Sequence, residues 1–388
     1  MINLDAAATS PVRREVIEAM FPFLTGAYGN PSSQHALGTA AARALTEARE
    51  AMAEILRCRP GEVIFTSGGT EADNLAIKGV ALARREARPE RNRLLVSALE
   101  HPAVVESAQY LHRWHGFEVE IIPVDAEGFL RQDVLSQRLG PDVALVSVMY
   151  ANNEVGTVQQ LDQLSELLAR HGVPLHSDAV QAAGWLPLGL EELGVDALSL
   201  SGHKFGAPKG IGALALRSRL RAEPLIHGGG QQGGRRSGTE NVAFAVALAT
   251  AARLAERERP AAHSRVAALR DQFIDTVLQR LPGAILTGPA TDHSERRLPS
   301  IASFCFPGMH GESVLLELEQ RSVLCSSGSA CAAGSSEPSA VLLALGVSPE
   351  VAQTAVRFSL PSTVTAQQLD IAAGAVADAV ESLGRLER

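Results

Sequence analysis

A single lysine with polar neighbours ends an apolar run in the segment SLSGHKFG (199–206). A lysine partly withdrawn from water loses its proton more easily and can form a Schiff base with a carbonyl compound. Ser201 and His203 add hydrogen-bond donors suited to a phosphate. Taken alone, Lys204 is more often a surface residue whose charged end reaches water, so the other polar groups of the chain must be considered with it.

A glycine-rich turn, TSGGTEADN (66–74), separates a strand-like run from a helical pattern. Backbone N–H groups at such a helix start, at Gly69 and with the Thr70 hydroxyl, form an anion site suited to a phosphate. The turn lacks the lysine and the spacing of a nucleotide-binding P-loop. A helix cap at Thr70 explains the same residues equally well when they are taken alone.

A carboxylate ends another apolar run, in HSDAVQAAG (176–184). A buried carboxylate is costly unless it is paired. Asp178 therefore either caps the helix that follows or pairs with a protonated ring nitrogen of a ligand. In the second case Gln181, in the next turn, would reach another polar atom of the same ligand.

His101 in LEHPAV (99–104) and Asn153 in ANNEVGT (151–157) also follow apolar runs, and each alone is equally well a turn residue. Together, however, several strand ends supply an anion cradle, a carboxylate, a lysine and an imidazole to one edge of a sheet, where ligands bind in open α/β folds. This set matches pyridoxal 5′-phosphate (PLP), which has a phosphate to bind, a pyridine nitrogen to keep protonated, an aldehyde to condense and a ring to stack.

Seven apolar runs are expected to form the sheet that positions these groups, at 62–66, 93–98, 119–124, 143–149, 173–177, 196–201 and 212–216. They are continuously apolar rather than alternating, as strands buried on both faces are. Segments between them, such as 71–86 and 161–172, carry apolar residues at helical spacing. The sequence therefore predicts an α/β fold with a large, mainly parallel sheet.

The C-terminal third has a different order of elements. Two alanine-rich helical stretches, 241–258 and 262–281, precede strand-like and helical segments in mixed order, which indicates a smaller α+β domain. Because no Pro/Ser-rich linker separates the parts, one long helix could instead bridge them. We expect a large domain at 13–254 and a small domain made of 1–12 and 255–388, since one core stops growing near ~250–300 residues.

Composition limits the class of protein. Of 388 residues, 46% are hydrophobic and 20% charged, with a formal net charge of -8, which describes a folded protein and argues against a nucleic-acid surface. The sequence shows no signal-peptide pattern and no apolar run of the ~20 residues that cross a membrane, so we expect a cytoplasmic protein. The cysteines, Cys58, Cys305, Cys325 and Cys331, show neither a disulfide framework nor a zinc-binding pair.

Motifs along nearly the whole chain resemble those of the NifS/IscS-type cysteine desulfurases, PLP enzymes of the class V aminotransferase family. They are LDAAAT (4–9), GNPSSQH (29–35), TSGGTEADN (66–74), EHPAV (100–104), ANNEVGT (151–157), HSDAVQA (176–182), SLSGHKFGAPKG (199–210), GGGQQGGRRSGTEN (228–241), CSSGSACAAGSSEPS (325–339) and VRFSL (356–360). The resemblance implies the aspartate aminotransferase-like fold (fold type I) and an enzyme that converts L-cysteine to L-alanine.

The resemblance also implies roles toward PLP. Lys204 would form the Schiff base, His101 would stack on the ring and move protons, and Asp178 would face the pyridine nitrogen. Gln181 would bind the ring hydroxyl, with Asn153 nearby. Phosphate contacts are expected from Gly69, Thr70, Ser201 and His203, and from Thr239 of the partner subunit in a homodimer.

Substrate and sulfur contacts are implied in the same way. Arg357 would hold the substrate carboxylate, for which a guanidinium fork is well shaped, with Asn30 and Asn153 assisting. Cys331, at the end of SSGSAC in a loop at about 325–337, would accept the sulfur, whereas Cys325 is expected to pack as a small apolar residue. No resident metal is expected, and Cys331 is the one candidate for a transient iron–sulfur ligand.

In the mechanism that the resemblance implies, Lys204 removes the α-proton of L-cysteine, the Cys331 thiolate attacks the substrate sulfur, and L-alanine leaves. The persulfide then passes to a protein acceptor, for iron–sulfur cluster assembly or another thiolation pathway. Two departures stand out: Ala6 replaces an asparagine frequent in relatives, and the chain lacks the extended tail by which some relatives dock an iron–sulfur scaffold.

Two other functions remain compatible with the sequence. One is another PLP enzyme of this fold, an aminotransferase or a β-lyase, acting without a persulfide. The other is a catalytically silent subunit that docks sulfur-transfer partners, although the presence of Lys204, Asp178, His101 and Cys331 together argues against it. The sequence leaves open the acceptor, whether for iron–sulfur assembly, transfer RNA thiolation or DNA phosphorothioation, and any selenocysteine activity.

Overall fold

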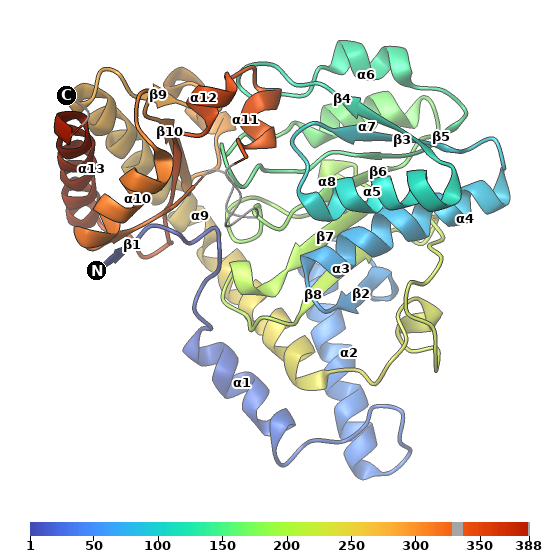
Figure 1. Cartoon of the computed structure of the whole chain (residues 1–388). Coiled ribbons are helices and arrows are strands. Elements are labelled where there is room, and N and C mark those ends of the chain that lie inside the picture. Colours follow the sequence, from blue (N-terminus) through green and yellow to red (C-terminus); the bar gives the residue numbers. More distant parts are fainter. Residues whose placement is uncertain (328–336, 387–388) are drawn as a thin grey trace.

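The computed structural model describes residues 1–327 and 337–386. At its centre lies a seven-stranded sheet in the order β2-β8-β7-β6-β5-β3-β4 (Figure 1). Within the described residues of this sheet, only β8 runs antiparallel to its neighbours. The strands are β2 (Val63–Thr66), β3 (Arg93–Ser97), β4 (Glu118–Ile122), β5 (Val143–Ser147), β6 (Leu175–Asp178), β7 (Ala197–Ser201) and β8 (Gly212–Leu216). The predicted α/β fold with a large, mainly parallel sheet is confirmed.

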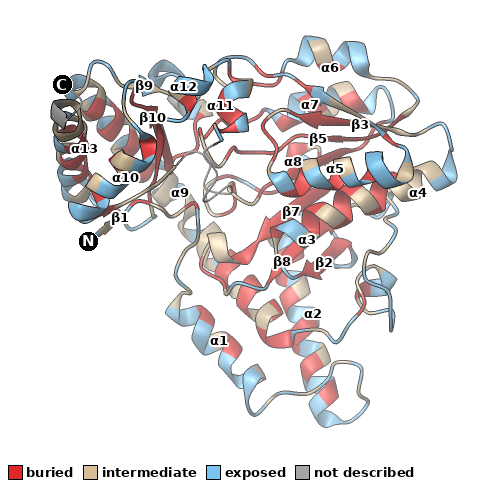
Figure 2. Ribbon diagram, in the orientation of Figure 1, coloured by how far each residue is buried: buried red, intermediate tan, exposed pale blue. Residues whose placement is uncertain are grey.

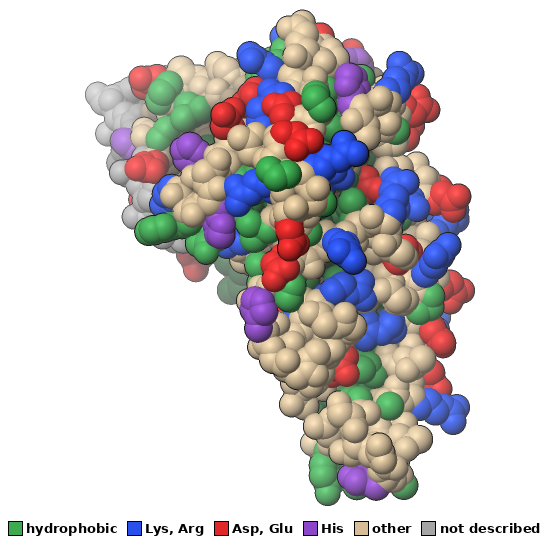
Figure 3. All heavy atoms as spheres, turned by 90° about the vertical axis from the view of Figure 1, so that its right-hand side faces the viewer, with side chains coloured by type: hydrophobic (Ala, Val, Ile, Leu, Met, Phe, Trp, Pro, Cys, Tyr) green, Lys and Arg blue, Asp and Glu red, His purple; other side chains and the backbone are tan. Residues whose placement is uncertain are grey.

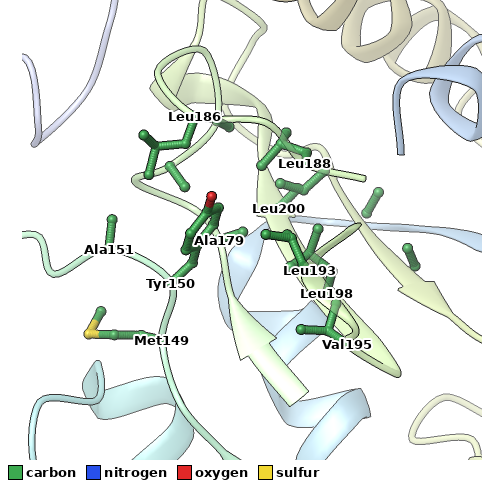
Figure 4. Packing of buried hydrophobic residues seen from close by; sticks show 14 of the residues in the cluster. Met149, Tyr150, Ala151, Ala179, Leu186, Leu188, Leu193, Val195, Leu198 and Leu200 are labelled. Atoms are coloured by element: carbon green, nitrogen blue, oxygen red, sulfur yellow. The ribbon is translucent and has the colours of Figure 1, made fainter. Parts of the chain in front are cut away.

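Successive residues of each strand point to opposite faces of the sheet, and both faces are covered. In β2, Val63 and Phe65 belong to one buried hydrophobic cluster and Ile64 to another. Figure 2 shows buried strands between helices whose outer surfaces are exposed, and Figure 4 shows part of the first cluster around Leu198 and Leu200. Burial on both faces explains why these strands are continuously apolar in sequence.

The two faces have different helices. The face with Ile64 packs against α3 (Gly69–Asn74), α4 (Val80–Ala87) and α5 (Pro102–His115), with a π-helical segment (Leu75–Gly79) joining α3 to α4. The opposite face packs against α2 (Ala36–Leu56), α7 (Leu161–Ala169) and the first half of α9 (Val242–Arg280). The other helices that precede α9 are α1 (Arg14–Leu24), α6 (Gln132–Arg138) and α8 (Leu190–Leu193).

Helix α9 corrects the sequence prediction. The expected helices at 241–258 and 262–281 form one helix of 39 residues that contains Pro260, which is the bridging alternative. A proline inside a helix removes one backbone hydrogen bond and usually bends or breaks the helix. Here the first half of α9 is buried in the cluster beneath the large sheet and the second half in a C-terminal cluster. This packing on both sides of Pro260 outweighs the local preference for a break.

The C-terminal part is built around an antiparallel sheet in the order β12-β13-β10-β9 and a parallel pair of β1 and β11. Phe273 of α9 makes edge-on ring contacts with Phe304 and Phe358 of this sheet. The elements are β1 (Ile2–Asn3), β9 (Ile285–Leu286), β10 (Ile301–Cys305), α10 (Gly311–Gln320), β11 (Val323–Leu324), β12 (Ser326–Ser327), α11 (Ala340–Ala344), α12 (Pro349–Ala352), β13 (Ala355–Ser359) and α13 (Ala366–Leu386). The domain division at 254/255 stays a prediction, because α9 runs across it.

Exposed apolar side chains gather on α1. Ile17, Phe21 and Leu24 lie at helical spacing on α1 and are 49%, 58% and 55% exposed, and Tyr28 and Leu37 follow in the connection to α2 and at its start. On the face seen in Figure 3, basic and acidic side chains are interspersed. No helix among the described residues is both long enough and apolar enough to cross a membrane.

Candidate active site

Lys204 lies directly after β7, in a short 3₁₀ turn (Gly202–Lys204). Its Nζ donates hydrogen bonds to the carbonyl oxygens of Ala7, at 2.5 Å, and Ala8, at 3.0 Å. Gln181, which follows β6, donates from Nε2 to the same Ala7 oxygen at 2.9 Å. Two side chains from different strand ends therefore meet at one carbonyl of the N-terminal segment. Both line a cavity of about 310 Å³, to which Ala6 also contributes.

Asp178 ends β6 and is buried, and its Oδ1 accepts a hydrogen bond from the Val180 N–H at 2.8 Å. Burial raises the pKa of this carboxyl, while the Val180 hydrogen bond and the nearby His101 and Lys204 lower it. The side chain thus favours ionisation only with positive charge close by. Asp178, His101 and Lys204 form one electrostatic group.

His101 caps the start of α5, and its Nδ1 accepts a hydrogen bond from the Ala103 N–H at 3.1 Å. Burial lowers the pKa of His101, Asp178 raises it, and Lys204 lowers it further. Because Nδ1 accepts a hydrogen bond, the neutral ring carries its proton on Nε2. His101 also lines a second cavity, of about 460 Å³, together with Thr70.

The predicted anion cradle is assembled from two strand ends. A Cβ built on Gly69, at the start of α3, would lie 2.7 Å from Val180 Cγ2 and 3.3 Å from the Cβ of Ser201. The backbone of the glycine turn thus approaches the end of β7 as only glycine allows. His203 follows Ser201, and its Nδ1 lies 3.0 Å from Thr9 Oγ1. Burial and the neighbouring Lys204 lower the pKa of His203 to about 4, so its ring is neutral near pH 7.

Arg357 lies in the middle of β13 and is only 2% exposed. Its Nη2 lies 3.1 Å from Asp5 Oδ1, and its Nη1 donates to the backbone oxygen of Asn153 at 3.1 Å. The buried Nε has no hydrogen-bond partner within residues 1–327 and 337–386. An unsatisfied buried donor next to a cationic fork provides capacity for one more anionic acceptor.

Two predicted site residues, Asn30 and Thr239, lie apart from the residues around Lys204, and a third lies outside the described residues. Asn30 and Thr239 are exposed and line neither cavity. Asn30 Oδ1 accepts from the backbone N–H of Ser32 at 2.9 Å. The loop with Thr239 is joined to α3 by the ion pair of Arg236 with Glu71. Cys331 lies outside the described residues.

Burial disfavours the thiolate at each of the other cysteines, because it raises their pKa. The value is about 12 for Cys58 and Cys325 and about 11 for Cys305. Cys325 packs at the edge of the C-terminal cluster. These three side chains are poor nucleophiles near pH 7.

The sequence prediction missed a set of buried polar residues next to the predicted site. They are Asp73, Glu100, Ser147, His176 and Ser199, together with the half-buried Asp5 and Glu154, which contact Arg357 and Ser339 respectively. Glu100 and His176 stand inside the motifs EHPAV and HSDAVQA, beside His101 and Asp178. Polar residues within the apolar, strand-like runs were the sequence signal for the members of this set that lie in strands. The sequence does not show which of these residues face one another.

The aminotransferase class-V family model matches residues 2–371. The chain belongs to this family. It is 43% identical to cysteine desulfurase IscS of Dictyoglomus turgidum, covering 98% of this chain and 95% of the relative. It is 45% identical to the IscS-like cysteine desulfurase of Mycobacterium tuberculosis, covering 96% and 94%.

Solved structures of the family agree with this assignment. A NifS-like protein is similar with a TM-score of 0.90 and 35% identity, covering 98% of this chain and all of that one. DndA from Streptomyces lividans is similar with a TM-score of 0.73 and 33% identity, covering 92% and 98%. SspA in complex with cysteine has a TM-score of 0.80 and 32% identity, covering 94% and 100%. The predicted family and fold type are thereby confirmed.

Proposed function

We infer that the chain is a cysteine desulfurase, which takes sulfur from L-cysteine and releases L-alanine. Relatives of that name match it at 43% and 45% identity over nearly their full length. The observation that carries the proposal is the position of Lys204, after a strand of the large sheet and within one electrostatic group with Asp178 and His101.

The described residues fit PLP. Asp178 is a buried carboxylate that needs a cationic partner, which a protonated pyridine nitrogen supplies. The close approach of Gly69 to Ser201 leaves a cradle that a Cβ would fill. When bound, PLP withdraws electrons from the substrate carbon that loses its proton.

We propose that Lys204 is both the covalent anchor of the cofactor and the base of the reaction. Its Nζ, held by the Ala7 and Ala8 carbonyls, takes the α-proton of L-cysteine once it is neutral. His101 would stack on the ring and would carry a movable proton on Nε2, and Gln181 would bind the ring hydroxyl. Asn153 would complete the ring contacts, and Gly69, Thr70, Ser201 and His203 would hold the phosphate.

Arg357 is proposed to orient the substrate through its carboxylate, with its free Nε–H and an adjacent Nη–H as donors. Cys331 is proposed to attack the substrate sulfur and to carry it as a persulfide. The rival thiol, Cys325, is half-buried, and desolvation raises its pKa to about 12, so it does not supply a thiolate near pH 7. The persulfide then passes to a protein acceptor.

We propose a homodimer that buries the apolar group on α1, namely Ile17, Phe21 and Leu24. Exposed apolar residues at helical spacing are typical of a surface that packs against a partner. Asn30 and Thr239, which line neither cavity of their own chain, would serve the site of the partner subunit. Sedimentation of the wild type and of Phe21→Asp tests this; a monomeric wild type would reject it.

The function is tested by incubating the purified protein, loaded with PLP, with L-cysteine. We expect equal amounts of L-alanine and of sulfur, recovered as sulfide when a thiol reductant is present. Pyruvate instead of alanine would identify a β-lyase, and amino-group transfer to an oxoacid would identify an aminotransferase. A protein that stays colourless with added PLP would be a docking subunit.

A further inference from the structure

Five buried polar side chains lie around the strand end that carries Asp178. Glu100 precedes α5, Ser147 ends β5, His176 lies in β6, Ser199 lies in β7 and Asp73 lies in α3. The most exposed of them, Glu100, is 6% exposed, and the others are at most 1% exposed. None of them belongs to the cofactor, substrate or sulfur contacts proposed for the reaction.

The sheet register brings three of these residues to one face. Ser147 is the neighbour of His176 across β5 and β6, and Ser199 is the neighbour of Asp178 across β6 and β7. Residues two apart on one strand share a face, so His176 and Asp178 point to the same side.

The side chains are connected from end to end. Glu100 Oε1 accepts from the Met149 N–H at 2.5 Å, and its Oε2 lies 3.4 Å from Ser147 Oγ. Ser147 Oγ lies 2.9 Å from His176 Nδ1, and His176 Nε2 lies 3.0 Å from Ser199 Oγ. Ser199 is hydrogen bonded to the Asp73 carboxyl. One carboxyl is thus linked to another through two hydroxyls and an imidazole.

Burial and the neighbouring charges decide the protonation of Glu100, Asp73 and His176. Burial is the largest cause that raises the pKa of Glu100 to about 8 and that of Asp73 well above its usual range, and the nearby Asp178 contributes to both shifts. Burial lowers the pKa of His176 to about 3. His101 and Lys204, which lower the pKa of Asp178, are the charged groups that oppose the effect of burial on that carboxyl.

The hydrogen bonds are consistent with neutral groups. A protonated Glu100 donates to Ser147, which donates to His176 Nδ1; His176 Nε2–H donates to Ser199, which donates to Asp73. Asp73 Oδ1 has no hydrogen-bond partner among the described residues and lies 3.6 Å from His176 Nε2. A neutral oxygen tolerates such a position better than a charged one.

We propose that these five residues form an uncharged hydrogen-bonded support in which Glu100 and Asp73 are neutral acids, so that Asp178 is the single negative charge facing the cofactor. Glu100 is also a positioning residue, because it fixes the backbone of its neighbour His101 to the end of β5 through Met149. The statement that Asp178 is the single negative charge facing the cofactor rests on the proposed function. The protonation of the two acids stands independently of it.

A second negative charge here would raise the pKa of Asp178 and reduce its ability to hold a protonated ring nitrogen. Neutral hydrogen-bonding groups avoid that repulsion and still fill the polar positions between the strands. The support therefore explains how three carboxyl groups occupy one buried region.

The test counts neutral carboxyl groups in the protein as purified, by infrared spectroscopy at pH 7. We expect the C=O stretch of protonated carboxylic acids, reduced in Glu100→Gln and again in Asp73→Asn. Glu62→Gln is the matched control, because Glu62 is also buried but its hydrogen bonds to Ser218 and Arg59 lower its pKa. A band that neither Glu100→Gln nor Asp73→Asn reduces would overturn the proposal.

Isotope-labelled glutamate or aspartate, incorporated into the wild type, moves the same band without any substitution. The labelled protein thus shows, even if a variant does not fold, whether glutamate and aspartate side chains carry the band, and a band that neither label moves would overturn the proposal. The effect on the cofactor is read from the pH dependence of the visible absorption of the PLP-loaded protein. Glu100→Gln should keep the wild-type profile below pH 8, whereas Glu100→Ala should shift it.

The two failures are distinguishable. If Glu100→Gln changes the absorption profile as strongly as Asp178→Asn does, Glu100 acts as an anion and the inference is wrong. If the infrared band responds as expected but L-cysteine yields no alanine, the support exists and the proposed function fails.

Discussion

Replacing Arg357 by lysine separates the charge of this side chain from its shape. The guanidinium uses Nη1 for the Asn153 oxygen and Nη2 for Asp5, which leaves Nε–H for an incoming acceptor. Lysine keeps the positive charge, but its single ammonium group cannot reach the Asn153 oxygen, Asp5 and the incoming acceptor at the same time. Losing one charge-assisted hydrogen bond costs about 1.5–3 kcal/mol, so kcat/KM for L-cysteine should fall roughly 10- to 100-fold.

The assay compares L-cysteine with cysteamine, which has the same amine and thiol but no carboxylate. Binding of each compound is followed by the visible absorption of the PLP-loaded protein. Arg357→Lys should weaken the binding of L-cysteine and leave that of cysteamine nearly unchanged. Arg270→Lys is the matched control, since Arg270 is equally buried and donates to the Arg297 and Leu298 carbonyls. Equal losses for both compounds would refute the assignment of Arg357 to the carboxylate.

Further predictions concern the thiols, a buried acid and the long helix. Cys331→Ala should keep the bound cofactor but form no protein persulfide, whereas Cys325→Ala should still form it, as mass spectrometry of the protein after L-cysteine would show; the opposite pattern would exchange the two assignments. Folded Glu100 holds a proton up to about pH 8 while the unfolded side chain loses it near its ordinary value of 4.5, so the free energy of unfolding should fall as pH rises between these values. Glu100→Gln should flatten this slope in denaturant titrations, and an unchanged slope would place the proton elsewhere. Pro260→Ala should restore one helical hydrogen bond in α9 and stabilise the protein by about 2 kcal/mol. An interior proline costs about 3 kcal/mol, and the greater freedom of the unfolded chain without proline offsets about 0.4–1 kcal/mol of the gain. A lower melting temperature of the variant would show that α9 is more stable with Pro260 than without it.

Much of the fold and of the candidate site follows from local sequence. Apolar runs of strand length predicted the large sheet, and a polar residue at the end of such a run predicted the neighbourhood of Lys204 and Asp178. The reason is physical, because the carboxyl ends of parallel strands meet at one edge of the sheet. The position of each residue at the end of its own strand was therefore enough to predict that Lys204 and Asp178 lie near each other.

Features set by long-range packing could not be predicted in this way. Pro260 predicts a helix break by its local chemistry, and the continuity of α9 depends on two hydrophobic clusters distant in sequence. The contact of Ser147 with His176 depends on the register of β5 against β6, which no single strand specifies. The Ala7 oxygen that receives Lys204 and Gln181 carries no side-chain signal at all.

The N-terminal segment has a consequence for the order in which the protein is assembled during synthesis. The Ala7 N–H donates to Ser359 Oγ across 352 residues of sequence, at 2.8 Å, and β1 pairs with β11. The first residues to leave the ribosome thus find their partners only after almost the whole chain has been made. Lys204 and Gln181, synthesised midway, gain their shared acceptor at that late moment. An incomplete chain that lacks β13 has no Ser359 to fix Ala7, so the Ala7 carbonyl that accepts from Lys204 is not held in place. The reactive centre is therefore completed only in a chain that has been synthesised through β13.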